Sequence, residues 1–286
     1  MHILDKSVQC HLLADDTTIE VQGTLSTVQT SLQSALADID QWCGRNHMVL
    51  NPLKTKSMLV STRQKHQLST NTLTLKLSGS NIEQVNEHKL LGVVIDNSLR
   101  WNAHIDSLCK RVSKNLFLLS KLQSVISLEA RKLFYYAHIK SHIDYASFLW
   151  DGCSEALFKN INSLHRRAAK LILPNTSMSP ESKMETLGML PLKKHLQLNK
   201  AVFMHKIIHG NAPVYLKQLF REAPSRYSVF KRNLACPKPR VDIYKTSVAY
   251  SGAFVWNALP LHHKSIFKLS SFRSHTTKLL RAQCKL

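Results

Sequence analysis

Apolar and polar residues alternate with a period of two on both sides of an aspartate pair near the start of the chain. The alternation runs from Val8 to Leu12, and it returns from Thr18 to Val21 after Asp15–Asp16. This period is typical of strands with one buried face, and Asp tolerates the backbone angles of a tight turn. The pattern therefore predicts a β-hairpin that turns at the two aspartates.

The spacing of apolar residues changes to three and four from Leu25 to Trp42. This spacing predicts an amphipathic helix with Thr24 or Ser26 as its N-cap and a break near Gly44. Short extended segments follow, and the sequence SGSN predicts a turn between the last two. The predicted extended segments are residues 56–62, 72–77 and 88–96.

Long helices are predicted for most of the remaining chain. One begins at Asn102, and its apolar stripe reaches Leu122. The segment Ala223–Arg240 is rich in Pro and Arg without a clear period, so we expect a loop there. Further helices are predicted at Leu128–Trp150, Ala156–Leu173 and Leu192–His209, with a short helix from Pro213 and a last helix from about Ser271. Pro174 ends the second of these helices, and Gly210 is the C-cap of the third. The expected fold class is α+β, predominantly helical.

The chain is strongly basic, and its charge is unevenly distributed. The formal net charge is +21 over 286 residues. The first 155 residues carry 16 Lys and Arg against 14 Asp and Glu, whereas the residues from Ala156 onward carry 23 against 4. A basic half predicts a polyanionic partner, nucleic acid ahead of an anionic membrane surface. The alternative is a basic face that is simply solvated.

Cysteine usage and hydropathy limit the cellular context. The six cysteines are scattered, with no Cys-x-x-Cys pair, which favours reduced thiols, no disulfide-linked partner and an intracellular location in the nucleus or cytoplasm. Asp5 and Lys6 interrupt the first apolar run, so the N-terminus does not have the pattern of a secretory signal. No stretch has the roughly 18 uncharged apolar residues of a membrane span, so no membrane partner is expected.

Two adjacent carboxylates at a hairpin turn have two interpretations. Asp15 and Asp16 could bind a divalent cation, because Mg²⁺ prefers oxygen ligands and keeps waters for substrate phosphates. They could equally point into solvent. The residues of the turn alone do not decide between these interpretations.

The surrounding segments resemble a known family. LLADDTTI resembles the (Phe/Tyr)-Ala-Asp-Asp motif of reverse transcriptases, although Leu13 replaces the aromatic residue. WCGRNHMVLNPLKTKSML and HKLLGVVIDNSLRWNAHI resemble later segments of non-LTR retrotransposon enzymes, although Leu90 replaces a common aromatic residue. The resemblance continues in order through YAHIKSHIDYASFLW, LHRRAAKLI, LGMLPLKKHLQLNKAVFMHKIIHGNAPVYLKQLF and VWNALP. These later segments are typical of the Jockey-like and chicken-repeat-like lineages.

The resemblance implies a domain organisation and a metal site. Residues 1–96 would be the C-terminal half of a polymerase palm, residues 97–173 a helical thumb-like region, and residues 174–286 a basic helical C-terminal region. Asp15, with Asp16 as its partner, would bind Mg²⁺ for RNA-directed DNA polymerisation on an RNA template and a DNA primer. The helix from Leu25 to Trp42 would pack behind the palm sheet.

Three further groups are candidate site residues. The resemblance puts Lys54 near the pyrophosphate, and it makes Leu91 and Gly92 part of a primer-grip hairpin. The alternatives are a surface lysine and a plain core strand. Arg166, Arg167 and Lys170, in the sequence RRAAK, lie at helical spacing, so they are expected to contact phosphate or to form the solvated face of the helix.

The polymerase motifs of the family are incomplete in this sequence. In that family another palm aspartate and a Gly/Gln segment precede the aspartate pair, but only fourteen residues precede Asp15 here, and Asp5 lacks the motif. We therefore expect the chain to be a C-terminal portion that retains the Asp-Asp motif and does not polymerise alone, with Mg²⁺ bound only if an upstream segment completes the site. The alternatives are a non-catalytic nucleic-acid-binding relict and a structural or interaction protein.

Histidines and aromatic residues complete the set of candidates. His138 and His142 are one helical turn apart, as zinc ligands can be, but a packed or solvated pair is favoured because no third ligand is evident. The adjacent pair His262–His263 need not converge on one metal. Aromatic residues near cations could stack on unpaired bases, and Trp256 is expected in the core. The other aromatic candidates are Tyr227, Phe230, Tyr244 and Phe254.

Overall fold

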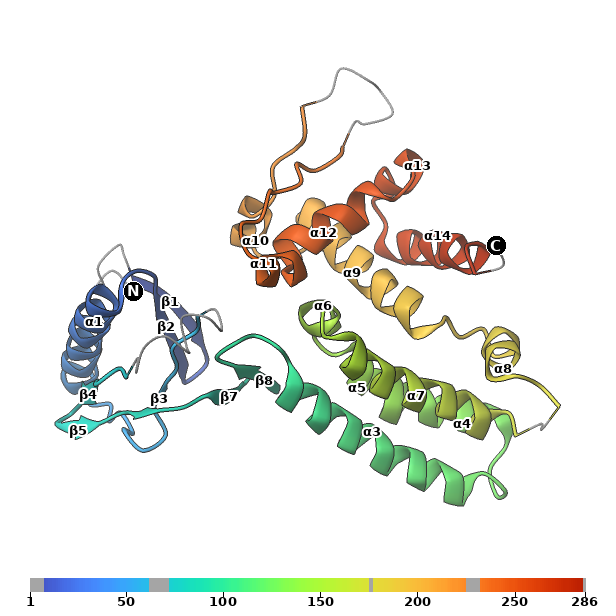
Figure 1. Ribbon diagram of the computed structural model, residues 1–286, viewed down its shortest axis with the longest axis horizontal. Helices are drawn as coiled ribbons and strands as arrows, with labels where there is room; N and C mark the ends of the chain where they lie inside the picture. Colours follow the sequence, from blue (N-terminus) through green and yellow to red (C-terminus); the bar gives the residue numbers. More distant parts are fainter. Residues whose placement is uncertain (1–7, 62–71, 175–176, 225–231, 285–286) are drawn as a thin grey trace. The chain divides into compact units, whose positions relative to one another are not determined.

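The fold is described from a computed structural model, which places residues 8–61, 72–174, 177–224 and 232–284. The chain divides into two compact units, Met1–Leu99 and Arg100–Leu286 (Figure 1). The first unit contains short strands and one long helix, and the second is helical. The predicted fold class, α+β and predominantly helical, is confirmed.

Four two-stranded sheets and the helix α1 make up the regular structure of the first unit in its described residues, 8–61 and 72–99. Three of the pairs are antiparallel (β1–β2, β4–β5 and β7–β8), and β3–β6 is parallel. The predicted hairpin and the SGSN turn appear. The extended segments appear only in part, because β3 and β4 are two residues long and a turn at Leu91–Gly92 divides the predicted segment 88–96 into β7 and β8. The elements are β1 Val8–Leu13, β2 Asp16–Val21, α1 Leu25–Arg45, β3 Lys56–Ser57, β4 Lys76–Leu77, β5 Ser80–Asn81, β6 Glu83–Gln84, β7 Glu87–Leu90 and β8 Val93–Asp96.

Helix α1 organises the core of this unit. Thr24 is its N-cap and accepts a hydrogen bond from the Thr27 N–H, which satisfies one of the free donors of the first turn. The buried face of α1 packs against apolar residues of β4 and the neighbouring loops, and Ile19 and Val21 of β2 join the same core. The Gln33 side chain also hydrogen-bonds both the N–H and the C=O of Lys76. The hairpin that carries the aspartates is therefore packed on α1.

In the part of the chain that the structure describes, the second unit contains twelve α-helices and one π-helical turn. Most of the long predicted helices appear within one to three residues of their expected ends. The helices are α3 Asn102–Leu122, α4 Leu128–Phe134, the π-helical turn η1 Tyr135–Lys140, α5 Ser141–Asp144, α6 Ser147–Trp150, α7 Glu155–Ile172, α8 Pro180–Thr186, α9 Leu192–Ile208, α10 Val214–Gln218, α11 Asp242–Thr246, α12 Val248–Asn257, α13 Leu261–Lys264 and α14 Leu269–Ala282.

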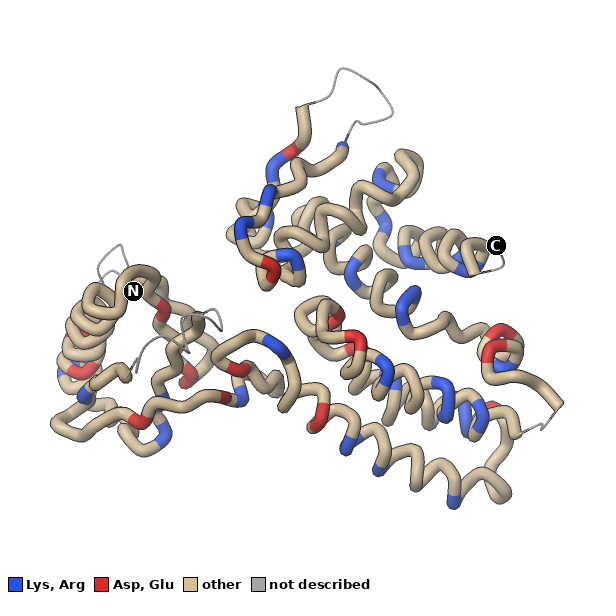
Figure 2. The backbone as a smooth tube through the Cα atoms, viewed as in Figure 1, with Lys and Arg blue, Asp and Glu red and all other residues tan. Residues whose placement is uncertain are grey.

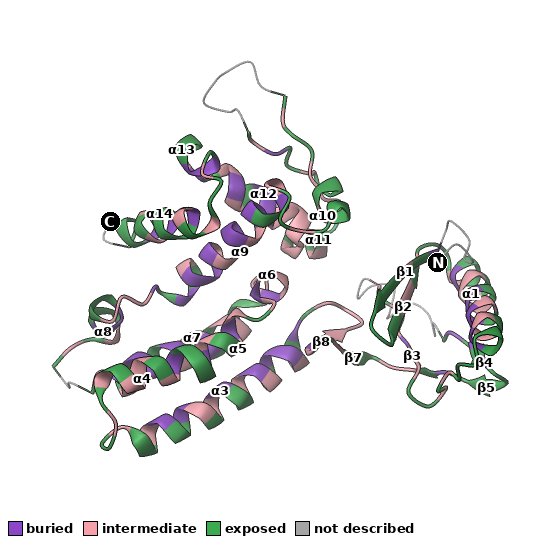
Figure 3. Ribbon diagram, turned by 180° about the vertical axis from the view of Figure 1, so that it is seen from behind, coloured by how far each residue is buried: buried purple, intermediate pink, exposed green. Residues whose placement is uncertain are grey.

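Two layers of packing hold this unit together. Helices α3 and α7 lie against each other with their buried faces inward (Figure 3). Helix α9 packs against α6, α10, α12 and α14, and residues all round it are buried. Trp256 and Phe272 are fully buried in the core beside it, as predicted for Trp256. Burial of such large rings dominates the energetics of a core.

The prediction of one helix from Leu128 to Trp150 is wrong. The segment begins as α4, widens into the π-helical turn η1 and ends as α5 at Asp144. Tyr145 is then extended, and Ala146 takes a left-handed φ of +49° before α6 begins. The segment contains no Gly or Pro to mark this break, and the reason lies in tertiary contacts of Asp144 and Ser147, described below.

Four shorter helices were not predicted, namely α8, α11, α12 and α13. In addition, α10 begins at Val214, with Pro213 as its N-cap rather than its first residue. The described parts of Ala223–Arg240 contain no helix or ladder and only an isolated bridge between Glu222 and Leu234, consistent with the predicted loop. Among the described residues, no helix is long and apolar enough to cross a membrane.

Candidate functional site

The aspartate pair lies at the turn of the β1–β2 hairpin, one residue away from the predicted geometry. Leu13 pairs with Asp16, so the two turn residues are Ala14 and Asp15, and Asp16 is the first residue of β2. The predicted turn at Asp15–Asp16 is therefore wrong by one position, because Asp16 continues the strand ladder. Ala14 has a φ of +53°, a region that residues with a Cβ rarely adopt.

The strand geometry fixes the direction in which Asp16 points. Ile19 and Val21 pack into the α1 core, and side chains on a strand alternate between its two faces. Asp16 therefore lies on the opposite, open face together with Glu20. Both aspartates are exposed, and neither makes an ion pair or side-chain hydrogen bond with another described residue.

The carboxylate oxygens of Asp15 and Asp16 suit Mg²⁺, but two carboxylates are few for a metal site. Carboxylate oxygens are the ligands that Mg²⁺ prefers. Within the described ranges, however, no three His, Cys, Asp or Glu side chains lie together as a metal site. Among the described residues, no third His, Cys, Asp or Glu side chain accompanies Asp15 and Asp16.

Lys54 lies in an exposed turn that follows α1. The Asn51 side-chain Oδ1 accepts hydrogen bonds from the N–H groups of Leu53 (3.1 Å) and Lys54 (3.2 Å), which fixes the turn. No hydrogen bond or ion pair among the described residues joins the Lys54 side chain to Asp15 or Asp16. Its role near a pyrophosphate stays a prediction.

Leu91 and Gly92 form the two-residue turn of the β7–β8 hairpin. Their φ angles are +47° and +84°, and a type I′ turn needs positive values at both positions. Gly meets this need without strain, whereas a bulky Leu does not. The Leu91 side chain is 49% exposed. The hairpin is present, and its contact with a primer stays a prediction.

The three predicted cations of α7 are all exposed, but they are not equivalent. Arg166 Nη2 lies 2.7 Å from Glu181 Oε1 in the first turn of α8. Arg167 and Lys170 have no ion pair with any described residue. Arg167 and Lys170 are thus the more available for phosphate, and Glu181 competes for Arg166.

A second basic face lies on α3, and the sequence analysis missed it. Lys110, Lys114, Phe117 and Lys121 are exposed and spaced at i, i+4, i+7 and i+11, so they share one side of the helix. We call these four residues the α3 stripe; Figure 2 shows basic residues along this helix. The Lys121 Nζ lies 5.4 Å from the Phe117 ring centroid. The spacing was visible in the sequence, where only the apolar face was noticed.

The two units differ sharply in charge. Residues 1–99 contain 8 Lys and Arg against 9 Asp and Glu, whereas residues 100–286 contain 31 against 9. The net charge is therefore −1 for the first unit and +22 for the second. The aspartate pair belongs to the nearly neutral unit, and the α3 stripe and α7 cations belong to the basic one.

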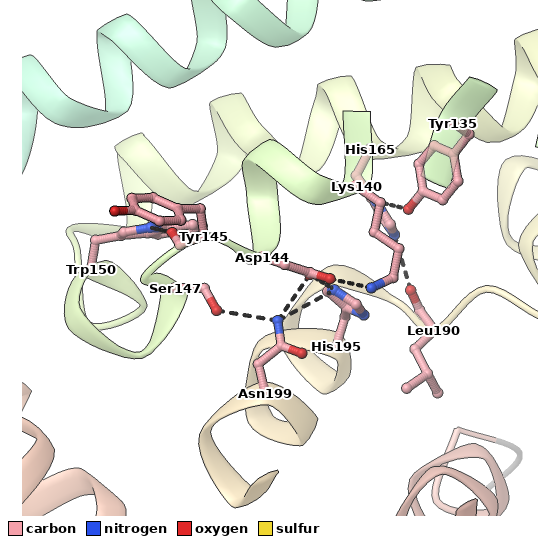
Figure 4. Close-up of polar contacts among 10 residues, drawn as sticks. All are labelled: Tyr135, Lys140, Asp144, Tyr145, Ser147, Trp150, His165, Leu190, His195 and Asn199. Carbon is pink, nitrogen blue, oxygen red and sulfur yellow. Dashed lines mark hydrogen bonds and ion pairs between the residues drawn. The ribbon is translucent and has the colours of Figure 1, made fainter. Parts of the chain in front are cut away.

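A polar cluster inside the second unit was also missed. The Asp144 carboxylate accepts hydrogen bonds from Lys140, His195 and Asn199, and Asn199 Nδ2 also donates to Ser147 Oγ at 3.2 Å (Figure 4). We call these five residues the Asp144 cluster. Burial alone would raise the pKa of Asp144, but its hydrogen bond with His195 and the nearby charges outweigh burial and hold that pKa well below its usual range.

His165 lies beside this cluster and is fully buried. Its Nε2 is 3.0 Å from the Leu190 carbonyl oxygen, to which it must donate, so Nδ1 accepts from the Tyr135 hydroxyl at 3.3 Å. Burial lowers the pKa of His165 to about 4 and raises that of Tyr135. The ring is therefore neutral at pH 7. Together, these contacts bind η1, α5 and α6 to α7 and α9, and they account for the break after Asp144.

The histidine pairs do not form a metal site in the described part of the chain. The His138 ring packs on Phe134, with centroids 4.7 Å apart, and the His142 pKa is lowered by burial and by Arg111 and His138. The rings of His262 and His263 lie 4.2 Å apart, and burial lowers the pKa of His263.

The aromatic candidates separate by burial. Trp256 is fully buried and its Nε1 donates to the Arg232 carbonyl at 2.9 Å. Tyr244 and Phe254 are 38% and 46% exposed. Tyr227 and Phe230 lie outside the described residues.

Comparison with known proteins gives one distant partial match. Over 145 residues, 49% of this chain, the sequence is 25% identical to the "Probable RNA-directed DNA polymerase from transposon BS" of Drosophila melanogaster. The match covers 16% of the length of that protein. No protein-family model and no solved structure matches the chain. The chain is thus distantly similar to a retrotransposon reverse transcriptase.

Proposed function

We propose that this chain is the C-terminal portion of an RNA-directed DNA polymerase of a non-LTR retrotransposon. In this proposal residues 1–96 form part of the palm, residues 97–173 a thumb-like region and residues 174–286 a basic C-terminal region. One observation supports it above the others: an exposed Asp-Asp turn and a strongly basic helical unit occur in a chain that is similar over 145 residues to such a polymerase.

Asp15 and Asp16 would hold Mg²⁺ in the completed enzyme. The ion would supply charge stabilisation for nucleotidyl transfer in the usual two-metal manner. The role of this chain is to present two carboxylates on a rigid hairpin, which Ile19 and Val21 pack onto α1. Because no third metal-binding side chain accompanies them within the described residues, we propose that the chain does not polymerise alone.

The helical unit would bind the RNA–DNA duplex through its basic faces. The α3 stripe extends from Lys110 to Lys121, about 17 Å of helix, and its lysines have no ion pair with other described residues. Arg167 and Lys170 on α7 add two cations. Cations held along a helix neutralise phosphates and release counterions, which makes the affinity strongly salt-dependent.

Binding to a labelled RNA–DNA duplex, measured by fluorescence anisotropy over a salt series, tests this interface. We expect the triple variant Lys110→Ala/Lys114→Ala/Lys121→Ala to reduce the slope of log affinity against log salt by about 3. The matched control removes three exposed lysines from α9 and α14. That control is Lys193→Ala/Lys206→Ala/Lys278→Ala. Equal losses in both variants, or no binding at low salt, would refute the proposed interface.

A primer-extension assay with Mg²⁺ tests the proposal that the chain does not polymerise alone. We expect no extension by the chain alone. Extension by the wild-type chain that Asp15→Ala abolishes would show a complete active site and would overturn the proposed inactivity.

The second candidate function is nucleic-acid binding without chemistry. The presence of only two carboxylates, Asp15 and Asp16, at the hairpin turn favours it. It predicts the same duplex binding and no effect of Asp15→Ala on affinity.

A further inference from the structure

Helices α11 and α12 carry aromatic rings on the surface of the basic unit. Tyr244 of α11 is 38% exposed and Phe254 of α12 is 46% exposed. Tyr250 lies one turn before Phe254, and the two rings are 4.6 Å apart at an angle of 44°. Lys245, which follows Tyr244 on α11, is exposed, with 53% of its side chain accessible to solvent. We call these four residues the α11–α12 surface.

The packing of α12 fixes the exposure of Phe254, whereas Tyr250 beside it is half-buried. Its inner face buries Gly252, Ala253 and Trp256 against α9. A Cβ on Gly252 would lie 2.6 Å from the Met204 sulfur, so α12 approaches α9 as closely as the backbone allows. Ser247 caps the helix by accepting a hydrogen bond from the Tyr250 N–H. Phe254 therefore faces outward because the opposite side of its helix is held in the core.

A single exposed aromatic ring needs no explanation, but this group combines three features. The rings of Tyr250 and Phe254 are adjacent, an exposed cation follows Tyr244 on the neighbouring helix α11, and residues 156–286 carry 23 Lys and Arg against 4 Asp and Glu. A polyanion complements that charge. A partner that also offers flat apolar faces complements the rings. Unpaired nucleobases on a phosphate backbone supply both features.

We propose that the α11–α12 surface binds single-stranded nucleic acid by stacking unpaired bases on Phe254, Tyr250 and Tyr244. The inference rests on the nucleic-acid partner of the proposed function, and it identifies a site distinct from the α3 stripe. A duplex cannot use this site, because its bases already stack on one another and present no open face. Lys245 holds the backbone of the bound strand.

The ion pair between Lys245 and Asp242 does not block this role. Lys245 Nζ lies 2.7 Å from Asp242 Oδ1, three residues earlier on α11, and both side chains are largely exposed. Exposed pairs of this kind are weak and are screened by salt. A phosphate can therefore replace Asp242 as the partner of Lys245.

The test measures the affinity of three Phe254 variants for a fluorescein-labelled dodecamer of uridines. Phe254→Leu keeps an apolar side chain without the ring, Phe254→Ala removes both, and Phe254→Tyr keeps the ring. We expect the Leu and Ala variants to bind about tenfold more weakly and the Tyr variant to bind as the wild type does, because base–aromatic stacking is lost only in the first two. A dodecamer of thymidines tests DNA in the same way.

A control position and a second probe make the result specific. Phe267→Ala removes a ring that is 72% exposed elsewhere in the unit and should leave affinity unchanged. The affinity of the Phe254 variants for the RNA–DNA duplex should also be unchanged. A loss with only one of the two dodecamers would assign the surface to that nucleic acid.

Two outcomes would overturn the inference. In one, Phe254→Leu binds the single strands as tightly as the wild type. In the other, it loses affinity equally for single strands and duplex. Either result can occur while the α3 stripe still governs duplex binding, so the inference can fail separately from the proposed function. Absence of any nucleic-acid binding by the wild type would refute both.

Discussion

The Asp144 carboxylate accepts a hydrogen bond from His195 Nε2 although 51 positions separate the two residues in the chain. Their contact joins the end of α5 to the first turn of α9. The His195 side chain is 7% exposed and the Asp144 side chain 31% exposed, so water screens the pair only in part. Breaking such a pair leaves a partly buried charge without one of its donors, which is costly.

Replacing His195 with alanine should therefore destabilise the protein. We expect His195→Ala to lower the free energy of unfolding by about 3 kcal/mol, measured by urea denaturation followed by circular dichroism. His138→Ala is the matched control, because His138 is exposed, and it should change the stability little. Equal effects of the two substitutions would contradict a structural role for the pair.

Acid should destabilise the helical unit through His165. Its pKa is lowered to about 4 by burial, from the 6.5 of an exposed histidine, so the unfolded chain takes up a proton at a higher pH than the folded one. Stability is then full above pH 6.5 and falls as the pH drops through 6.5 toward 4. By pH 5 the loss from this one residue should be about 2 kcal/mol.

Urea denaturation at pH 7 and pH 5 tests whether the free energy of unfolding falls on acidification. His165→Gln removes the titrating group, so its stability should fall less than that of the wild type between the two pH values. Burial also lowers the pKa values of His205, His209 and His263, so part of the pH dependence should remain in the variant. A wild type that becomes more stable at pH 5 would contradict the assignment.

Glu181 should restrain nucleic-acid binding by α7. It pairs with Arg166, and both side chains are largely exposed. Glu181→Gln releases Arg166, and we expect duplex affinity at low salt to rise about threefold. Glu222→Gln changes the net charge by the same amount away from α7 and serves as the control. An equal rise in both variants would show an effect of net charge alone.

The turn at Leu91 should be improved by a residue that accepts a positive φ. Leu91→Asn creates an Asn-Gly type I′ turn, and we expect a gain of about 1 kcal/mol in the free energy of unfolding. Leu12→Asn makes the same chemical change at an exposed position of β1, where φ is negative, and should give no gain. A gain at Leu12 and none at Leu91 would refute the strain argument.

The sequence predicted elements whose pattern is local. The period of two defines the aspartate hairpin, and the period near 3.6 defines α1, α3 and α7, because each of these helices has one clear buried face. Helix α9 is buried on all sides, and Gly210 marks its end. Helix α12 has apolar residues on all sides and therefore no such period. The break at Ala146 carries no Gly or Pro, so it could not be recognised.

The candidate site was predictable only in part, because only patterns that are local in the sequence can be recognised. Local alternation marks the turn at Asp15 and Asp16. The turn at Leu91 and Gly92 was expected only from the family resemblance, because the local pattern predicts one extended segment there. The Asp144 cluster is held by hydrogen bonds between residues up to 55 positions apart, and nothing in one sequence links them. The α3 stripe differs, because its spacing is local and was overlooked beside the stronger apolar pattern of the same helix.

The uneven charge of the two units has a kinetic consequence. An excess of 22 positive charges in the helical unit attracts a polyanion before contact, over roughly one Debye length, about 8 Å at physiological ionic strength. The nearly neutral unit adds almost nothing to this attraction. A nucleic acid should therefore be captured first by the helices, and the aspartate hairpin should meet only strands that the helices have already recruited.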